Sequence, residues 1–144
     1  MKVLVLNGPN LNLLGEREPE VYGTLTLGEI DRRIKDRADR LGMEIRSIQS
    51  NLEGELIDAI QDARTWADAI VINPGGYSHT SVAIRDAIAA IDVPVIEVHL
   101  SNPSAREDFR QRDLVGEVSR GVVSGFGWMS YILALEAVAT MGEG

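Results

Sequence analysis

The stretch AIVINPGGYSHTSVAIRDAI at residues 69–88 decides the fold that this sequence predicts. It begins with a short apolar run that lacks polar alternation, turns at Gly75 and Gly76, and continues from Ser81 with apolar residues at helical spacing. A fully apolar strand that leads through a tight turn into an amphipathic helix is typical of a parallel sheet covered by helices. The stretch therefore predicts an α/β protein.

The same alternation recurs on both sides of this stretch. Apolar, β-branched runs occur at residues 2–7, 44–50, 69–73, 93–98 and 121–125. Helical patterns are expected from Thr26 to Gly42, after Asn51, from Ser81, over a short polar segment from Ala105 to Gln111, and from Trp128 to Thr140. Five such units predict a flavodoxin-like, five-stranded parallel sheet with helices on both faces. We expect one domain over residues 1–144, without repeats or a linker.

The last predicted helix differs from the others because it is apolar on nearly all sides. Such a helix must be covered on more than one side. Either it lies deep against the sheet or it packs on another subunit. In so small a domain we expect the second arrangement, which implies an oligomer.

Composition restricts the partners of the chain. Its formal net charge of −8 at pH 7 argues against nucleic acid, since phosphate binding needs clustered Lys and Arg. There is no cysteine, which excludes disulfides and thiolate metal sites. No apolar run is long enough to span a membrane, and Met1 leads directly into a charged residue without a signal-like segment. We expect a soluble protein of the cytoplasm.

A long connection follows the first strand. It reads NGPNLNLLGEREPEVYG at residues 7–23, whereas strand and helix are usually joined by roughly two to six residues. Connections of this length are mostly functional or disordered. The connection contains several prolines and glycines, and its polar tip carries Arg17 and Tyr22. This composition predicts a lid over about residues 15–25 that brings a cation and a phenol to a site. The alternative is a surface loop without function.

Polar side chains gather where the predicted strands end. They are Asn10 after the first strand, Asn73 and His79 after the third, and Glu97 and His99 at the end of the fourth. In open parallel sheets the ligand binds outside the carboxyl ends of the strands, where the strand order reverses. Both histidines of the chain fall at this edge, so we expect the functional site there.

Acid–base chemistry is the function that these residue types favour. Glu97 and His99 stand two apart in an extended segment, so their side chains point to the same face. A carboxylate so placed fixes the tautomer of the imidazole and equips it to hold and deliver a proton. The alternative is an exposed glutamate at a strand end.

A phenol is a poor base at neutral pH unless nearby cations stabilise its phenolate, which one or two guanidinium groups in a partly dry site can do. Arg17 can supply one for Tyr22, and Arg106 and Arg110 are the other candidates. Lysine occurs only at positions 2 and 35, away from the polar edge, so imine chemistry has no evident nucleophile.

The glycine turn after the third strand leaves two further functions open. Gly75 and Gly76 allow close approach of a ligand, and the helix that follows offers N–H groups to an anion, although the turn can also be purely structural. The usual nucleotide motifs are missing from both this turn and the first helix. His79 and His99 share no metal-ligand motif, so no metal is expected. A flavodoxin-like module that binds flavin or phosphate, and an interaction scaffold built on the last helix, are the alternatives to an enzyme.

Four motifs in order resemble those of type II 3-dehydroquinate dehydratases. They are NGPNLNLLG at residues 7–15, REPEVYG at 17–23, NPGGYSHTS at 73–81 and EVHLSN at 97–102, and the similarity includes QSN at 49–51 and EGEL at 53–56. The resemblance implies a flavodoxin-like lyase that converts 3-dehydroquinate to 3-dehydroshikimate by anti elimination through an enolate. The reaction would serve the shikimate pathway of aromatic amino acid biosynthesis or quinate breakdown. The resemblance also implies no metal, no organic cofactor, and trimers assembled into a homododecamer.

The resemblance further implies roles for individual residues. Tyr22 is expected to take the proton next to the ketone, Arg17 to keep it ionised, and Asn10 to hold a water that donates to the enolate oxygen. His99 is expected to protonate the departing hydroxyl, with Glu97 behind it. The substrate-binding residues are expected to be Asn73, Gly75, Gly76, His79, Arg110 and the backbone at Leu100 and Ser101, together with Asp86 from a neighbouring subunit.

This chain departs from the family pattern at three places. Gly76 stands where alanine is common, and Leu52 stands where histidine is frequent. Gln111, Arg112 and Asp113 replace a His-rich or Ser-containing run. No expected catalytic group is lost, so these departures bear on local geometry, substrate affinity and assembly contacts.

Overall fold

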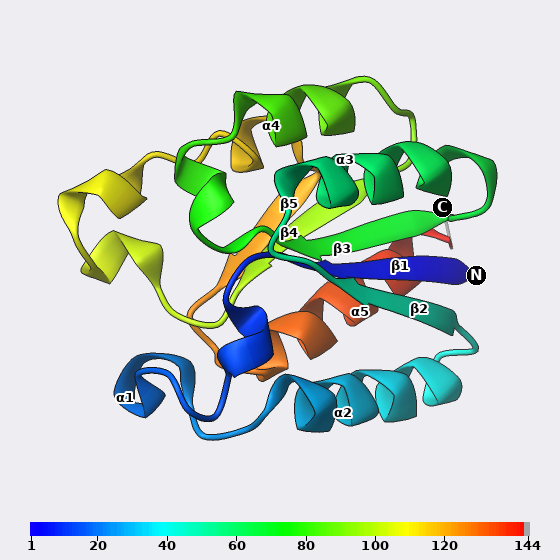
Figure 1. Ribbon diagram of the computed structural model, residues 1–144. Coiled ribbons are helices and arrows are strands. Elements are labelled where there is room, and N and C mark those ends of the chain that lie inside the picture. The colour runs from blue at the N-terminus through cyan, green and yellow to red at the C-terminus, as the bar shows by residue number, and fades with distance from the viewer. Residues whose placement is uncertain (143–144) are drawn as a thin grey trace.

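The computed structural model describes residues 1–142, and a single parallel sheet of five strands forms its centre (Figure 1). The strands are β1 (Lys2–Asn7), β2 (Glu44–Gln49), β3 (Ala69–Asn73), β4 (Val95–His99) and β5 (Gly121–Ser124). Their order is β2-β1-β3-β4-β5, so the direction of winding reverses between β1 and β3. The predicted flavodoxin-like sheet is confirmed, and the reversal lies beside the polar edge expected to hold the site.

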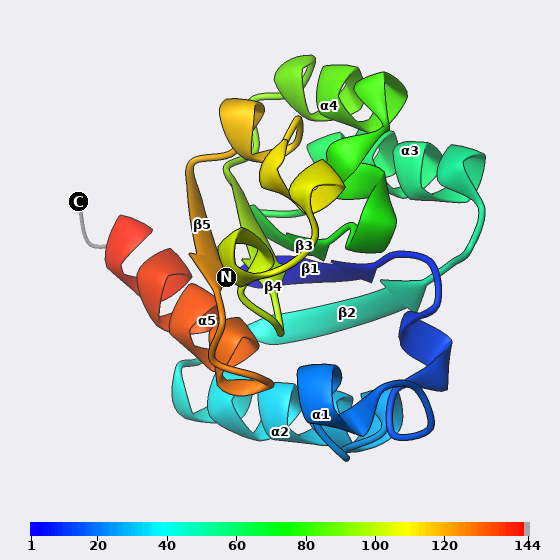
Figure 2. The same cartoon turned by 90° about the vertical axis from the view of Figure 1, so that its left-hand side faces the viewer.

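Helices cover both faces of the sheet. They are α1 (Pro19–Tyr22), α2 (Leu27–Arg40), α3 (Glu53–Asp62), α4 (Val82–Ala89) and α5 (Met129–Met141). Figures 1 and 2 show α3 and α4 on one face and α2 and α5 on the other, with the short α1 beyond the edge of the sheet. No helix within residues 1–142 has the length and apolar content needed to cross a membrane.

Side-chain caps fix where two of the helices begin. The Thr26 hydroxyl accepts the Glu29 backbone N–H at 3.2 Å and donates to the Glu29 carboxylate at 3.2 Å, so Thr26 caps α2. Ser81 caps α4 in the same way by accepting the Ile84 N–H at 2.9 Å. These caps set the entry of the chain into α2, after the lid, and into α4, after the glycine turn.

Two apolar cores lie on either side of the sheet. One packs β1, β3 and β4 residues such as Val5 against α2 and α5, and the other packs residues such as Leu6 against α3 and α4. Because both faces of the central strands are buried, β1 and β3 carry an unbroken apolar sequence. The strand ends are thereby held rigidly, which matters for the side chains just beyond them.

Two expected elements differ in the structure. The helix expected from Ala105 to Gln111 is wrong: the segment forms two 3₁₀ turns, Pro103–Ala105 and Asp108–Gln111. The reason is that Arg106 adopts extended backbone (φ −114°, ψ −163°) and interrupts any helical hydrogen bonding. The fourth strand also begins two residues later than expected, at Val95, and reaches His99.

The apolar last helix lies against the sheet on one side, and its packing on another subunit stays a prediction. α5 buries Tyr131, Leu135 and Val138 in the core. Met129 and Leu133 remain 38% and 40% exposed on its outer side. The sheet therefore covers only part of this helix in a single chain.

Candidate active site

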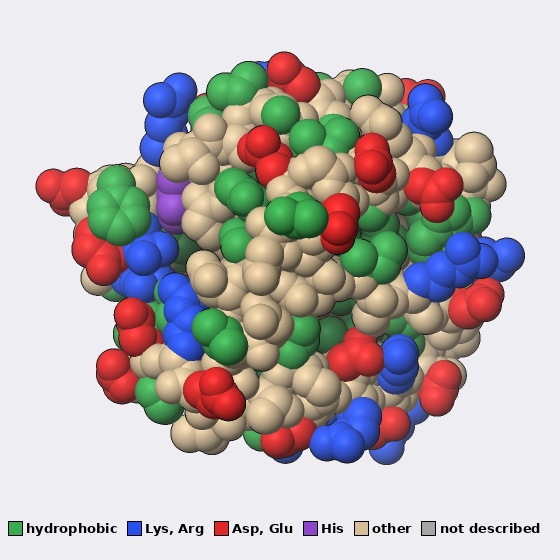
Figure 3. All heavy atoms as spheres, in the orientation of Figure 1, with side chains coloured by type: hydrophobic (Ala, Val, Ile, Leu, Met, Phe, Trp, Pro, Cys, Tyr) green, Lys and Arg blue, Asp and Glu red, His purple; other side chains and the backbone are tan. Residues whose placement is uncertain are grey.

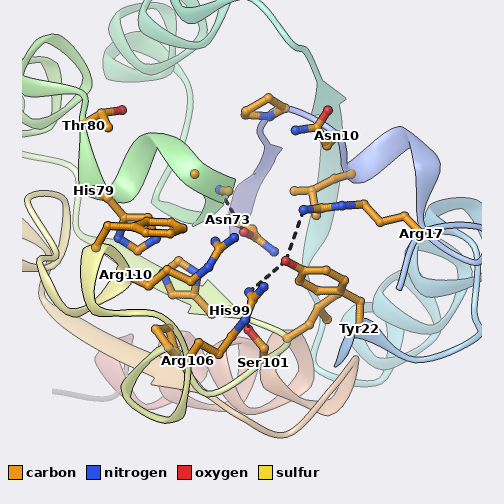
Figure 4. Close-up of a pocket in the computed structure, with 17 residues that line it drawn as sticks. Asn10, Arg17, Tyr22, Asn73, His79, Thr80, His99, Ser101, Arg106 and Arg110 are labelled. Carbon is orange, nitrogen blue, oxygen red and sulfur yellow. Dashed lines mark hydrogen bonds between the residues drawn. The ribbon is translucent and has the colours of Figure 1, made fainter. Parts of the chain in front are cut away.

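A pocket of about 240 Å³ opens at the carboxyl edge of the sheet, where the winding reverses. It is lined by Pro9, Asn10, Leu11, Arg17, Tyr22, Asn73, Gly75, Gly76, His79, Thr80, His99, Leu100, Ser101, Pro103, Arg106, Phe109 and Arg110 (Figure 4). On the surface, Figure 3 shows histidine next to a group of arginine or lysine side chains on this side of the molecule. Cations therefore gather at the pocket although the chain as a whole is acidic.

The lid is anchored to the body of the protein before its polar tip. Leu11 and Leu14 are buried in the core beside α2. After Gly15 the chain turns outward, and Glu18 adopts a left-handed conformation (φ 36°) before Pro19 starts the single turn α1. Proline suits this first helical position because its φ is already fixed and it lacks the N–H that would be unpaired there. Tyr22 ends the turn and faces the pocket.

Two guanidinium groups converge on the Tyr22 hydroxyl, as the dashed lines in Figure 4 show. Arg17 donates to it at 3.2 Å and Arg106 at 2.8 Å. Both guanidinium groups also lie over the tyrosine ring, at 4.4 and 5.2 Å from its centroid. The expected Arg17–Tyr22 pair is present, and Arg106 is the closer of the two donors. Two cations at one phenol oxygen stabilise its phenolate.

Arg106 reaches the phenol because of the extended backbone that breaks the expected helix. Its side chain is only 15% exposed, and it makes a looser ion pair with Glu18 at 3.8 Å. It also donates to the Ser101 hydroxyl at 3.4 Å. Arg106 thus ties the lid to the segment that follows β4.

The Glu97–His99 pair stands at the end of β4. His99 Nε2 lies 2.9 Å from Glu97 Oε1, and both side chains are buried, Glu97 completely. The exposed-glutamate alternative is therefore wrong. Because Nε2 faces the carboxyl group, Nδ1 is the ring nitrogen left for the pocket that His99 lines.

Burial sets the charge of this pair. Loss of solvation, and then the neighbouring Asp113, raise the pKa of Glu97 to about 10. Loss of solvation lowers the pKa of His99 to about 4, with a partial offset from the negative charge of Asp113. At neutral pH Glu97 is therefore a protonated carboxylic acid and His99 a neutral imidazole. Transfer of the Glu97 proton to His99 would convert the pair to a carboxylate and an imidazolium.

A buried tyrosine fixes the floor of the pocket. The Tyr131 hydroxyl donates to Asn7 Oδ1 and accepts the Asn73 amide N–H at 3.0 Å. Asn73 Oδ1 in turn accepts the Gly75 N–H at 3.1 Å. This network joins β1, β3 and α5 below the pocket and orients the Asn73 amide that lines it.

The remaining wall combines a histidine and an arginine. His79 Nδ1 lies 2.8 Å from the Arg112 carbonyl, so it carries the proton and donates, which leaves Nε2 for the pocket. Arg110 is held by Glu107 at 2.6 Å. Gly75 has a positive φ of 59°, and a side chain there would press on Pro9, so the turn can pack this closely only with glycine.

The pocket brings together all but two of the expected site residues. Glu97 lies behind His99 rather than at the surface of the pocket. Asp86 is exposed on α4, where it pairs with Arg85, and does not line the pocket of its own chain. Arg106 was one of several cation candidates from sequence, whereas the contacts of Asp113 with the acid pair had no signal in the sequence.

Known proteins match the chain in both sequence and structure. The family described as Dehydroquinase class II matches residues 1–139. A 3-dehydroquinate dehydratase of Phenylobacterium zucineum (strain HLK1) is 61% identical over 141 residues, covering 98% of this chain and 97% of that protein. The type II dehydroquinase from Butyrivibrio crossotus DSM 2876 superposes with a TM-score of 0.94 at 44% identity, covering 96% of this chain and 97% of that one. The enzyme from Propionibacterium acnes gives a TM-score of 0.94 at 40% identity, with 96% of both chains covered.

The fold and the site define an α/β enzyme of acid–base chemistry, with a phenol and an imidazole across one pocket. The chain belongs to the class II dehydroquinase family, and its reaction is the dehydration of 3-dehydroquinate. The predicted family, fold and enzyme class are confirmed. The flavin-binding and scaffold alternatives are therefore set aside.

Proposed function

We propose that the pocket dehydrates 3-dehydroquinate by removing a proton with Tyr22 and delivering one through His99. The observation that carries this proposal is the convergence of Arg17 and Arg106 on the Tyr22 hydroxyl, across the pocket from the Glu97–His99 pair. A stabilised phenolate and a buried proton donor are the two groups that an elimination of water needs.

The first step forms an enolate. The Tyr22 phenolate takes the proton from the carbon next to the ketone, and the electron pair of that C–H bond moves toward the ketone oxygen. Arg17 and Arg106 stabilise the phenolate beforehand. Asn10 lines the pocket and holds a water that donates a hydrogen bond to the enolate oxygen.

The second step expels the hydroxyl group as water. His99 gives a proton from Nδ1 to the departing oxygen while Glu97 passes its own proton to Nε2, and the C–O bond breaks as the enolate electrons form the conjugated double bond. The product is 3-dehydroshikimate, and exchange with solvent returns the proton from Tyr22 to the Glu97–His99 pair. The proton count balances, because one proton is taken and one is delivered.

The rest of the pocket orients the substrate. Asn73, His79 and Arg110 bind its hydroxyl groups, and the backbone at Leu100 and Ser101 takes its carboxylate. The pocket supports this arrangement because all of these residues line it. The glycine turn at Gly75 and Gly76 lets the backbone come close to the ligand.

A neighbouring subunit completes the site in this proposal. Asp86 is exposed on α4 and does not line its own pocket, which leaves it free for the role that we propose at the site of a neighbour in a trimer. Exposed apolar side chains at Val122, Phe126 and Leu133 support a face covered by assembly, with the homododecamer as the proposed form. The chain would act in the cytoplasm as one catalytic domain over residues 1–144.

Direct turnover tests the proposal. The wild type should convert 3-dehydroquinate to the conjugated product, which is followed by its ultraviolet absorbance. Tyr22→Phe should lose about 10²–10⁴ in kcat, the usual contribution of a positioned base, and should keep its melting temperature. Tyr77→Phe is the matched control, since Tyr77 donates to the Asn51 carbonyl outside the pocket lining. Equal activity of Tyr22→Phe and wild type would refute the role of Tyr22.

A further inference from the structure

Asn10 has an unusual backbone conformation for a residue that lines the pocket. Its φ of 68° and ψ of −5° lie in the left-handed region, which only Asn10 and Glu18 adopt among the non-glycine residues that the structure describes. Asparagine tolerates this region better than most residues, but such a backbone keeps its place only when neighbouring groups hold it. The Asn10 side chain lies at the pocket (Figure 4), so the group that holds this backbone also places the side-chain amide.

The side chain of Asn51, in the turn after β2, holds the backbone of Asn10. Asn51 Oδ1 accepts the Asn10 backbone N–H at 3.0 Å. The same oxygen accepts a hydrogen bond from Gln49 Nε2 at 3.3 Å, and Gln49 Nε2 also donates to the Gly8 carbonyl at 3.2 Å. Because both groups that face Oδ1 are donors, the Asn51 amide is oriented with its oxygen toward Asn10.

The position of β1 in the sheet explains this contact. β1 lies between β2 and β3, so the chain that leaves β1 passes between the ends of both neighbouring strands. On the β3 side, the Gly8 N–H donates to the Asn73 carbonyl at 2.8 Å. A Cβ atom built on Gly8 would stand 2.6 Å from the Pro74 carbonyl oxygen, so the chain packs directly against the end of β3. Gln49 and Asn51 hold the same segment on the β2 side.

Asn51 is not the residue that starts the helix after it. Ser50 fixes the entry to α3, because its hydroxyl accepts the Leu52 N–H at 2.9 Å and donates to Glu55 Oε2 at 2.7 Å. The Asn51 side chain is exposed and contacts the segment after β1 instead. The side chain of Asn51 can therefore be changed with little effect on the fold.

We infer that Asn51 is a positioning residue for the dehydration, because its side-chain oxygen holds the backbone of Asn10 and so places the Asn10 amide at the pocket. This inference rests on the role proposed for Asn10, which is to hold the water that donates to the enolate oxygen. Groups that stabilise charge in a transition state act only when they are already in place, and a small displacement lowers the rate. Asn51 does not line the pocket, so it acts through Asn10.

Hydrogen exchange of the Asn10 amide tests the contact without turnover. The Asn10 N–H should exchange faster in Asn51→Ala than in the wild type, because its acceptor is gone. Asn51→Asp keeps an acceptor oxygen at the same position and should keep the slow exchange. Tyr77→Phe is the control, since it removes a 3.1 Å hydrogen bond to the Asn51 backbone carbonyl and leaves the side chain. Equal exchange rates in the wild type and Asn51→Ala would overturn the inference.

Kinetics show whether this contact serves the reaction. Asn51→Ala should lower kcat by about tenfold, as expected when a stabilising group is less well positioned, with KM and melting temperature little changed. The limbs of its kcat–pH profile should stay in place, because Tyr22 and the Glu97–His99 pair are not touched. Asn51→Asp should restore most of kcat, and Tyr77→Phe should keep it. An unchanged kcat in Asn51→Ala, or an equal loss in Asn51→Asp or Tyr77→Phe, would overturn the positioning role.

A double variant shows whether Asn51 acts through Asn10. Asn10→Gly removes the side-chain amide, while glycine adopts the left-handed conformation freely. It should lower kcat by about 10²-fold, as the loss of a group that stabilises the enolate oxygen does. Adding Asn51→Ala should then lower kcat no further, because the two residues form one unit. A further tenfold loss, of the size expected for Asn51→Ala alone, would show that Asn51 acts by another route and would overturn the inference.

Failure of the proposed function gives a different result. Full activity of Asn10→Gly, or a wild type without turnover, would refute the role of Asn10 or the proposed reaction, and the positioning role would fall with it. The exchange rates of the Asn10 amide would still show whether Asn51 holds that backbone. Loss of kcat in Asn10→Gly with full activity in Asn51→Ala would instead refute the role of Asn51 alone.

Discussion

The two sides of the pocket have opposite electrostatic environments. On the base side, Tyr22 sits in an irregular lid, is half-buried, and is surrounded by the cations Arg17 and Arg106. On the acid side, Glu97 and His99 sit at the end of a central strand, are buried, and face another carboxyl group. The first environment stabilises a negative oxygen, and the second suppresses charge and retains a proton.

This difference explains how the protein places a base and an acid in one small pocket. The cations around the phenol come from two irregular segments, the lid and the turns after β4, whereas the acid pair stands at the end of a central strand of the sheet. The environment rather than the residue type decides the role, as Tyr131 shows. Burial raises the pKa of Tyr131, and its hydroxyl serves only to join Asn7 and Asn73.

The largest expected effect on the acid side follows from replacing His99. His99→Asn should lower kcat by about 10²–10⁴, the usual contribution of a positioned acid or base, and should change KM little. His79→Asn is the comparison, because His79 faces the same pocket as a binding group and its loss should mainly raise KM. Steady-state kinetics separate the two. A loss in kcat for His79→Asn as large as for His99→Asn would contradict this division of roles.

Unequal effects are expected from the two arginines on the base side. Arg106→Met should lower kcat by about 10- to 100-fold, since hydrogen bonds to charged groups contribute roughly 1.5–3 kcal/mol. Arg17→Met should lower kcat less, because Arg17 is the more distant donor, at 3.2 Å against 2.8 Å. Methionine keeps much of the apolar stem, so melting temperatures should stay close to the wild type. A larger loss for Arg17→Met would show that the lid cation, not Arg106, stabilises the base.

On the acid side, the buried pair should make stability depend on pH. The pKa of Glu97 is raised from 4.5 to about 10, so between pH 4.5 and 10 the folded chain keeps a proton that the unfolded chain has lost. Stability should therefore fall as the pH rises through this window, by up to about 1.4 kcal/mol per pH unit. The lowered pKa of His99 acts only below 6.5, where it makes stability fall as the pH falls toward 4.

Urea unfolding at pH 7 and pH 9 measures this slope, and Glu97→Gln should flatten it because glutamine does not titrate. Tyr22→Phe should leave the dependence of stability on pH as in the wild type, because that dependence is assigned to Glu97 and not to Tyr22. Equal slopes for wild type and Glu97→Gln would show that Glu97 ionises normally in the folded chain.

The sequence predicted those parts of this site that depend on local spacing. Glu97 and His99 are two apart in a strand, and Arg17 and Tyr22 lie in one loop, so their proximity follows from short-range geometry. Arg106 lies 84 residues from Tyr22, and its reach depends on an extended residue within a pattern that resembled a helix. Asp113 meets Glu97 only through tertiary packing, and no local pattern reports such a contact.

The smallest effect is expected where the lid joins the body of the protein. Thr26 caps α2 directly after the lid, and its methyl group lies against Gly15 at the start of the lid. Thr26→Ala removes the cap and should cost about 1 kcal/mol of stability, measured by urea unfolding. Because Leu11 and Leu14 anchor the lid independently in the core, kcat should change little. A fall in kcat as large as that of Arg17→Met would show that the position of Tyr22 depends on this cap. The contacts at the start of α2 would then position Tyr22 more than its two arginines do.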